Sequence, residues 1–352
     1  MPPRIAYWTS AFEPEMEAIA AEVALLRRQF PGSVAWGLTH RHRLLLSWRR
    51  GYGLSPRLHL LFRAATRLLE PFFQLNHVFG SPGDWFYLEG SRRRPIVLTV
   101  ATWTLPVEPA LLRRVECFVV EHPGGRDLLK QAGIDPGRVR LIFPPVDLER
   151  FTPSPPPAGP FTVLFASSPD KAEWLEGRGV PQLLEAARLR PHMRFRLLWR
   201  PWGDSAPRVR QWIAERGLRN VELVTGCFPD MAVHYRQVHV TATPFTDLSR
   251  SKPAPNSLIE SLACGRPVLV TETVGLAEVV REAAAGEVSE PTGPGLAEAL
   301  DRLEADWISY STRARRLAER YFGVGAFLRG YRRLYAEVLG AGRVSSRCQP
   351  AG

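Results

Sequence analysis

The chain has 352 residues, an apolar fraction of 45% and a formal net charge of +11, which is enough for two domains of ordinary size. No run of about 18 apolar residues is present, so we expect no membrane-spanning helix, and the first residues indicate a strand rather than a signal peptide. The basic balance favours acidic partners, but nucleic-acid motifs are absent, so we expect no nucleic-acid partner. The spacing of Cys117, Cys227, Cys264 and Cys348 suits neither a zinc site nor a disulfide framework, and a reducing cytoplasm is the simplest location.

Short apolar runs alternate with helical patterns in the first half of the chain. A helix over 15–29 is predicted by apolar residues at helical spacing that follow a proline. Continuous apolar strands between helices predict a parallel sheet that is covered on both faces. The predicted strands are Ile5–Thr9, Val34–Leu38, Phe73–Phe79, Ile96–Val100, Cys117–Val120 and Val139–Phe143.

Five prolines in 153–160 predict a linker, after which the alternation of strands and helices restarts. The chain therefore divides into a first doubly wound α/β domain over 1–152 and a second over 161–322. Two such Rossmann-like domains joined by a hinge predict a cleft, with ligands beyond the carboxyl ends of the strands. The second domain is predicted to hold the strands Phe161–Phe165, Phe195–Trp199, Val221–Val224, Val238–Thr243 and Val268–Val270.

The segment 253–271 carries the clearest site pattern of the chain. Its two prolines can precede a helix but not lie inside one. Asn256 or Ser257 can cap the helix that follows, Leu258 begins its apolar face, and Gly265 ends it. The free N–H groups of such a helix N-terminus bind anions.

Glu260 lies within about a turn of that N-terminus and offers a carboxylate to accept hydrogen bonds from hydroxyl groups. A sugar nucleotide carries both a diphosphate and a ribose diol. An ordinary helix-to-strand unit of any α/β protein is the alternative interpretation. The segment resembles the donor site of retaining glycosyltransferases of the GT-B fold, in the family 4-like group that includes sucrose-synthase and mannosyltransferase-like enzymes. Glu260 matches the glutamate that holds the ribose there, and Gly265-Arg-Pro-Val matches the turn and strand that follow.

The resemblance implies a GT-B enzyme that transfers a sugar, with retention, from a nucleoside-diphosphate sugar to a sugar or lipid-linked acceptor. It makes 1–152 the acceptor-side domain, completed by a C-terminal helix over 326–340, and 161–322 the donor domain. Residues 341–352 are predicted to be a disordered tail. The sequence contains no Asp-x-Asp pattern, so we expect fixed cations and helix termini to stabilise the leaving diphosphate without a metal. No cofactor is expected beyond the sugar nucleotide.

The cations are expected in two loops of the second domain. Arg178 matches a lysine that precedes a glycine in the family, but Ser168 stands where the family has an arginine, and Lys171 nearby is the candidate replacement. Both bases have the alternative of being solvated. Lys252 stands eight residues before Glu260, where the family often has a second glutamate. It binds a phosphate, reads an acidic sugar, or is solvated.

The remaining candidates follow predicted strands. Cys227 and Phe228 are expected to read the base through backbone groups, although Phe228 suits a core equally well. His77 and His122 lie near strand ends, where they would touch the acceptor or the transferred sugar, but a lone histidine is more often structural. The family's frequent histidine after the strand at 96–100 is Ala101 here.

The stretch Arg41–Phe73 mixes seven arginines and one acid with apolar residues, a pattern typical of a helix at an anionic membrane surface. The alternative is an amphipathic helix packed on its own sheet. Two rival functions remain because of the departures at Ser168, Lys252 and Ala101. One is a sugar-nucleotide epimerase of GT-B fold, and the other is a degenerate copy that binds or scaffolds without catalysis.

Overall fold

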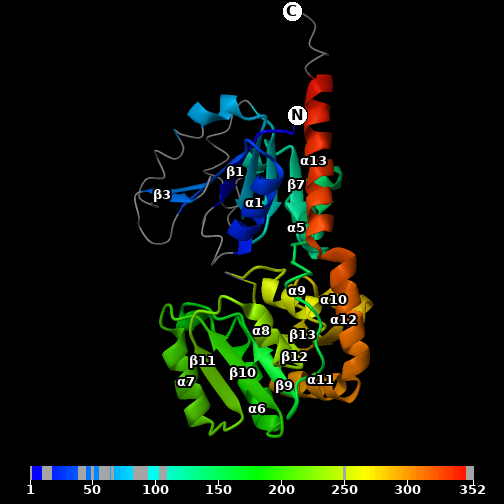
Figure 1. Ribbon diagram of the computed structural model, residues 1–352. Helices are drawn as coiled ribbons and strands as arrows, with labels where there is room; N and C mark the ends of the chain where they lie inside the picture. The colour runs from blue at the N-terminus through cyan, green and yellow to red at the C-terminus, as the bar shows by residue number, and fades with distance from the viewer. Residues whose placement is uncertain are drawn as a thin grey trace, which may run out of the picture. The chain divides into compact units, whose positions relative to one another are not determined.

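The computed structural model describes residues 2–9, 18–38, 45–48, 51–54, 64, 67–81, 94–102, 109–248 and 251–345. The chain divides into two compact units (Figure 1). Unit 1 holds the chain up to Pro144 and again from Gly325, and unit 2 holds Pro145–Val324. Each unit contains its own parallel sheet flanked by helices, so the predicted fold class of two doubly wound domains is confirmed.

Unit 1 is built on an eight-stranded sheet in the order β3-β4-β2-β1-β5-β6-β7-β8, parallel except for the pair β3–β4. The strands are β1 (Ile5–Thr9), β2 (Val34–Leu38), β3 (Leu45–Trp48), β4 (Gly51–Leu54), β5 (Leu75–Gly80), β6 (Ile96–Val100), β7 (Cys117–Val120) and β8 (Val139–Leu141). The helices are α1 (Ala18–Gln29), α4 (Pro109–Leu112), α5 (Gly124–Gln131) and α13 (Val324–Ser345).

Successive side chains of β1 point to opposite faces of this sheet and join two different cores. Ile5 and Tyr7 pack with residues of α1 and of α13, the helix drawn in orange-red in Figure 1. Ala6 and Trp8 pack on the other face with the segment that includes Leu112 and Leu129. The last helix of the chain therefore completes the core of the first unit, although it is far from it in sequence.

A helix was expected in the basic stretch 41–73, but two of its described segments are strands. Residues 45–48 and 51–54 are the strands β3 and β4, which extend the sheet beyond β2. The glycines at 51 and 53 explain the difference, because glycine is costly inside a helix. Most of the other residues of the stretch lie outside the described residues, so its predicted affinity for an anionic membrane stays a prediction.

Unit 2 contains a six-stranded parallel sheet in the order β11-β10-β9-β12-β13-β14 (Figure 1). The strands are β9 (Thr162–Phe165), β10 (Arg194–Trp199), β11 (Val221–Thr225), β12 (Val240–Thr243), β13 (Val268–Thr271) and β14 (Gly286–Ser289). The helices are α6 (Val180–Leu189), α7 (Ser205–Glu215), α8 (Met231–Arg236), α9 (Asn256–Ala263), α10 (Ala277–Glu282), α11 (Gly293–Ala305) and α12 (Trp307–Tyr321).

The Pro-rich segment 153–160 belongs to unit 2, and the division between units falls earlier, at Pro144–Pro145. One contact that holds this segment in unit 2 comes from Arg266, whose side chain is fully buried. Its guanidinium donates to Ser154 Oγ at 2.6 Å and to the Pro155 carbonyl at 2.9 Å. A buried cation must have such partners, so the segment predicted to be a hinge is fastened to the second unit.

The end of the chain also differs from the prediction. The helix α13 continues to Ser345, so residues 341–345 are helical instead of disordered. Nothing in this part of the sequence is a proline, and each residue added to an existing helix gains a backbone hydrogen bond. The tail after Ser345 lies outside the described residues.

Candidate functional site

The sheet of unit 2 has its topological switch point between β9 and β12. From β9 the following strands are added in one direction, and from β12 they are added in the opposite direction. Ligands of doubly wound sheets bind beyond the carboxyl ends of the strands at this point. Two segments begin there: residues 166–179 run from β9 to α6, and residues 244–255 run from β12 to α9. They carry the predicted cations Lys171, Arg178 and Lys252, and α9, which follows the second segment, carries the predicted residues 256–258 and Glu260.

The two segments are joined by close backbone contacts. Gly179 has a φ of 70°, and a Cβ at this position would lie 1.8 Å from the Pro244 carbonyl oxygen, so no other residue fits. The N–H of Thr246 donates to the Gly177 carbonyl at 3.0 Å. Arg178 is thereby held between two fixed glycines, with its guanidinium 5.0 Å from the centre of the Phe245 ring.

The Arg178 guanidinium is half-buried at the switch point. Burial lowers its pKa to about 10, against which the charge of Asp170 acts, so the side chain is charged at neutral pH. Lys171 differs: it is exposed, its Nζ lies 3.5 Å from Glu173 Oε1, and it stacks on Trp174. The structure thus gives Lys171 an acidic neighbour of its own, whereas Arg178 is fixed where the two segments meet.

The helix α9 begins without the cap that the sequence predicted. Pro255 occupies the N-cap position and no side chain caps the helix, because Asn256 and Ser257 are already helical. The N–H groups of Leu258 and Ile259 turn back to the Pro255 carbonyl. Ser257 Oγ lies 3.2 Å from Ser167 Oγ, which ties the helix start to the segment that follows β9. The predicted stop is confirmed, since Gly265 has a φ of 66°.

Three buried oxygens between β12 and α9 have no hydrogen-bond partner among the described residues: Thr243 Oγ1, Ser251 Oγ and Asn256 Oδ1. Thr243 is fully buried and Ser251 is 2% exposed. Buried polar groups are nearly always paired, and an unpaired one costs about 1–3 kcal/mol. We call this segment, 243–256, the switch-point edge. Its polar groups suit a ligand that supplies the missing partners.

Glu260 lies one turn into α9 and is half-buried. The Tyr235 hydroxyl donates to Glu260 Oε2 at 2.9 Å. Burial raises the pKa of this carboxyl to about 7, while the bond from Tyr235 and the charges of Arg150 and Arg200 lower it. The pKa of the carboxyl therefore lies near neutral pH. Oε2 accepts from Tyr235, and Oε1, which has no partner among the described residues, can accept from a ligand hydroxyl.

Arg200 is a candidate that the sequence analysis missed. Its backbone N–H donates to Ser168 Oγ at 3.3 Å. Arg200 therefore lies beside the position where the family that the sequence resembles has an arginine. Its guanidinium stacks 4.8 Å from the Trp202 ring, and its charge acts on Glu260. A base directly after the predicted strand 195–199 was the available signal, since strand ends meet at one edge of the sheet.

Lys252 lies within the switch-point edge. It is half-buried between the buried Ser251 and Pro253, whose carbonyl accepts from Gly275 N–H at 2.9 Å. The segment that carries the ammonium group is therefore anchored to the rest of the unit. Its predicted role at a phosphate stays a prediction.

Cys227 and Phe228 follow the edge strand β11. Cys227 is exposed, and Phe228 is half-buried with its ring edge-on to His234 at 5.1 Å. Neither residue enters the main core of the unit. Base recognition at this position stays a prediction.

His77 was expected near the end of its strand, and it lies inside β5, which continues to Gly80. The ring is fully buried, with Nδ1 2.6 Å from Tyr335 Oη and Nε2 2.8 Å from Thr99 Oγ1. Thr99 Oγ1 lies in turn 2.9 Å from Tyr331 Oη. Burial holds the pKa of His77 well below its usual range. These four residues, the histidine network, join the sheet to α13, so His77 is structural.

His122 is placed differently. It follows β7, is 6% exposed, and its Nδ1 has no hydrogen-bond partner in the described part of unit 1. Burial lowers its pKa to about 4, so the ring is neutral at pH 7. A contact with the acceptor or the transferred sugar stays a prediction.

Two further features bear on the chemistry. The described residues contain no group of three or more His, Cys, Asp or Glu side chains that could hold a metal ion. Within the same residues, no helix is both long enough and apolar enough to cross a membrane.

The two units together have the GT-B fold. Sucrose-phosphate synthase from Thermosynechococcus elongatus matches with a TM-score of 0.77 at 17% identity, covering 96% of this chain and 100% of that one. HepE from Anabaena, solved in complex with UDP, matches with a TM-score of 0.76 at 16% identity, covering 95% and 100%. At such identities the likeness establishes the fold alone.

Residues 162–306, which make up most of unit 2, match the family model described as "Glycosyl transferases group 1". A D-inositol 3-phosphate glycosyltransferase of Streptomyces bingchenggensis is 31% identical over 270 residues, which cover 70% of this chain and 57% of that protein. Its counterpart in Geodermatophilus obscurus is 30% identical over 187 residues, covering 48% and 40%. The chain spans about half the length of these curated relatives.

Proposed function

We propose that the chain is a glycosyltransferase that moves a sugar from a nucleoside-diphosphate sugar to an acceptor. The observation that carries the proposal is the set of unpaired oxygens at the switch-point edge, next to Arg178 and the start of α9. Cations and helix N-termini bind diphosphates, and Glu260 offers Oε1 to a ribose hydroxyl. The family match over unit 2 and the UDP held by a protein of the same fold support this interpretation.

In this proposal the charge that develops on the leaving diphosphate is stabilised by fixed groups. Arg178 is preorganised by its neighbours, and Arg200 adds a second positive charge from the next strand. Preorganised charges of this kind are the largest single contribution in many enzymes. We propose that transfer retains the anomeric configuration, as the resemblance implies, and that no metal takes part.

A donor screen tests the proposed reaction. The protein is incubated with several nucleoside-diphosphate sugars, starting with UDP-glucose, and with sugar or lipid-linked acceptors, and the products are identified by mass spectrometry. A new glycoside supports transfer. An interconverted donor sugar would support the alternative of an epimerase, and nucleotide binding without turnover would support a catalytically inactive binding protein.

Metal independence is tested in the same assay. Activity is expected to persist in EDTA, because fixed cations take the role that a metal plays in other transferases. Complete loss in EDTA with recovery in manganese or magnesium would contradict this part of the proposal and leave the transfer reaction itself intact.

The role of Lys252 is tested by reversing its charge in Lys252→Glu. If Lys252 contacts a phosphate, binding of both UDP and the intact donor is lost, because an anion then faces an anion. If it reads the donor sugar, UDP binds as before and only the intact donor loses affinity. We propose the phosphate role, since Ser168 lacks the charge found in the family, and unchanged UDP binding would defeat it.

A further inference from the structure

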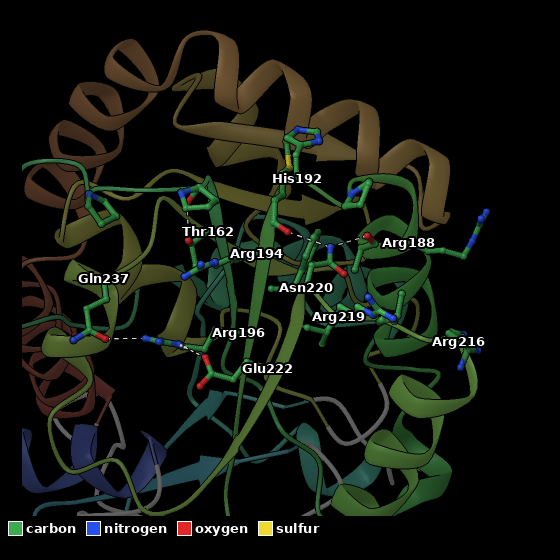
Figure 2. A pocket seen from close by; sticks show the side chains of 18 of the residues that line it. Thr162, Arg188, His192, Arg194, Arg196, Arg216, Arg219, Asn220, Glu222 and Gln237 are labelled. Carbon is green, nitrogen blue, oxygen red and sulfur yellow. Dashed lines mark hydrogen bonds and ion pairs between the residues drawn. The ribbon is translucent and has the colours of Figure 1, made fainter.

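A cavity of about 1100 Å³ lies at the end of the unit 2 strands that is opposite to the proposed donor site (Figure 2). It is lined by the segments that lead into β9, β10 and β11 and by the end of α8. These are the amino-terminal ends of the strands, whereas Arg178 and the switch-point edge lie at the carboxyl ends. The proposed donor site therefore does not explain this cavity.

The lining of the cavity is strongly basic. It contains six arginines and a single acidic residue, Glu222. The arginines come from the end of α6, from β10, from the turn between α7 and β11, and from α8. They are Arg188, Arg194, Arg196, Arg216, Arg219 and Arg236.

Only part of this charge is balanced by the protein. Arg196 pairs with Glu222 at 3.0 Å and donates to Gln237 at 2.7 Å, as the dashed lines in Figure 2 show. In contrast, Arg194 and Arg219 are exposed and form no ion pair with any described residue. The one acid of the lining is therefore already paired, and Arg188 pairs with Glu185, outside the lining, at 2.8 Å. The lining arginines that form no ion pair with a described residue are Arg194, Arg216, Arg219 and Arg236.

The cavity is held open by a rigid frame. The side chain of Asn220 donates to the carbonyls of Ala187, Arg190 and Met193 at 2.9, 3.1 and 3.1 Å. These bonds fix the turn between α6 and β10 against the start of β11. At the start of β10, the N–H of Arg194 donates to the Phe161 carbonyl at 2.8 Å. These bonds hold the backbone of the segments that carry the arginines in place.

We propose that this basic pocket binds a ligand that carries several phosphate groups. A guanidinium forms paired hydrogen bonds with phosphate oxygens, and here the arginines without an acidic partner among the described residues come from three segments: β10, the turn between α7 and β11, and α8. A single phosphate would meet only part of them. The volume of about 1100 Å³ lies just above the range for small-molecule pockets, about 300–1,000 Å³, so it leaves room for a ligand with two or three linked phosphates.

Titration calorimetry with inorganic tripolyphosphate tests the proposal on the full chain, with Lys252→Glu in every sample so that the proposed donor site does not bind the probe. The variant Arg194→Gln/Arg219→Gln is expected to bind about 100-fold more weakly than the protein with Lys252→Glu alone, at roughly tenfold for each guanidinium removed. The matched control Arg316→Gln/Arg320→Gln removes two exposed arginines from α12 of the same unit. It is expected to change the affinity by less than about threefold.

An equal fall in affinity in both double variants would show a general effect of net charge and overturn the proposal, as would a protein with Lys252→Glu alone that binds no tripolyphosphate. The variant Arg194→Lys/Arg219→Lys keeps the charge and the fold but cannot form paired hydrogen bonds, so an intermediate affinity is expected. If vesicles that contain phosphatidic acid compete with tripolyphosphate, the phosphates belong to a lipid headgroup. If the vesicles do not compete, the ligand is a soluble molecule.

The result is independent of the proposed transferase. If UDP produced no heat with the wild type, the proposed donor site would fail, but the difference between the two double variants would still report on the basic pocket. Conversely, a normal UDP response with identical tripolyphosphate binding in all variants would remove the pocket alone.

Discussion

The histidine network of unit 1 and the switch-point edge of unit 2 contain similar residues in opposite states. In the network, both ring nitrogens of His77 and the hydroxyl of Thr99 have protein partners within 2.9 Å. At the switch-point edge, the buried oxygens of Thr243, Ser251 and Asn256 have none among the described residues. A polar group that is satisfied by the protein stabilises the fold, and one that is left unsatisfied is a candidate for binding a ligand.

The same substitution, threonine to valine, tests the difference between the two regions. The largest effect on the free energy of unfolding is expected in the histidine network. Thr99→Val keeps the shape of a fully buried strand residue but leaves Nε2 of His77 and the hydroxyl of Tyr331 without a partner. We expect the free energy of unfolding to fall by about 2–4 kcal/mol, since each orphaned group costs about 1–3 kcal/mol. Denaturant titration followed by circular dichroism measures this, and UDP affinity is expected to stay unchanged.

Thr243→Val is the matched variant in unit 2. Its hydroxyl has no partner to lose, so the substitution is expected to leave the stability unchanged or raise it by up to about 1 kcal/mol. UDP affinity is expected to fall. A similar loss of stability in both variants would mean that the two threonines do not differ in kind, and the comparison would fail.

Glu260→Ala tests the predicted contact between this carboxylate and the ligand. The loss of a carboxylate that accepts from a ribose diol is expected to weaken UDP binding by about 1.5–3 kcal/mol, or roughly 10- to 150-fold. Calorimetry with UDP measures the effect, and a thermal melt checks that the variant is folded. Unchanged affinity in a folded variant would refute the ribose contact.

Arg178→Gln is expected to have the next largest effect, a fall in UDP affinity of about tenfold, because a fixed guanidinium is removed from the switch point. Lys171→Gln in the same loop provides the comparison. Lys171 is exposed and has Glu173 beside it, so a change of only a few tenths of a kcal/mol is expected. An equal fall in UDP affinity in the two variants would indicate that Lys171 also contacts a phosphate.

The same contrast explains what the sequence could and could not predict. The central strands of both sheets were predictable because they are continuous apolar runs, whereas the edge strands β3 and β4 were not predicted. The strand β14 was not predicted either, since Gly286–Ser289 has a single large apolar side chain. The partners of His77 were not predictable, because one histidine inside an apolar run gives no sign of partners that come from α13, more than 250 residues later.

The candidate site shows a similar limit. Glu260 and Gly265 were predicted from one local pattern of helix start and stop. Arg200 was missed because its position beside Ser168 depends on β9 and β10 being neighbours in the sheet. The basic pocket was missed for the same reason, since its arginines are scattered over four segments and meet only after the sheet has formed.

The smallest expected effect concerns stability and pH at Glu260. Burial places its pKa at about 7, above the ordinary value of 4.5, so between these values the native state binds more protons than the unfolded state. Stability therefore falls as pH rises from about 4.5 to about 7 and is level above that.

Glu260→Gln removes this titration and keeps an oxygen for the Tyr235 hydroxyl. Relative to the wild type, the variant is expected to gain about 1 kcal/mol in the free energy of unfolding between pH 5 and pH 8, a value reduced from the full linkage because the carboxyl is only half-buried. Urea titrations of both proteins at the two pH values measure the difference. A parallel pH dependence would mean that Glu260 ionises normally in the folded protein. The predicted gain in stability together with weaker UDP binding would show that this carboxylate is kept in α9, beside the switch-point edge, for a ligand and not for the fold.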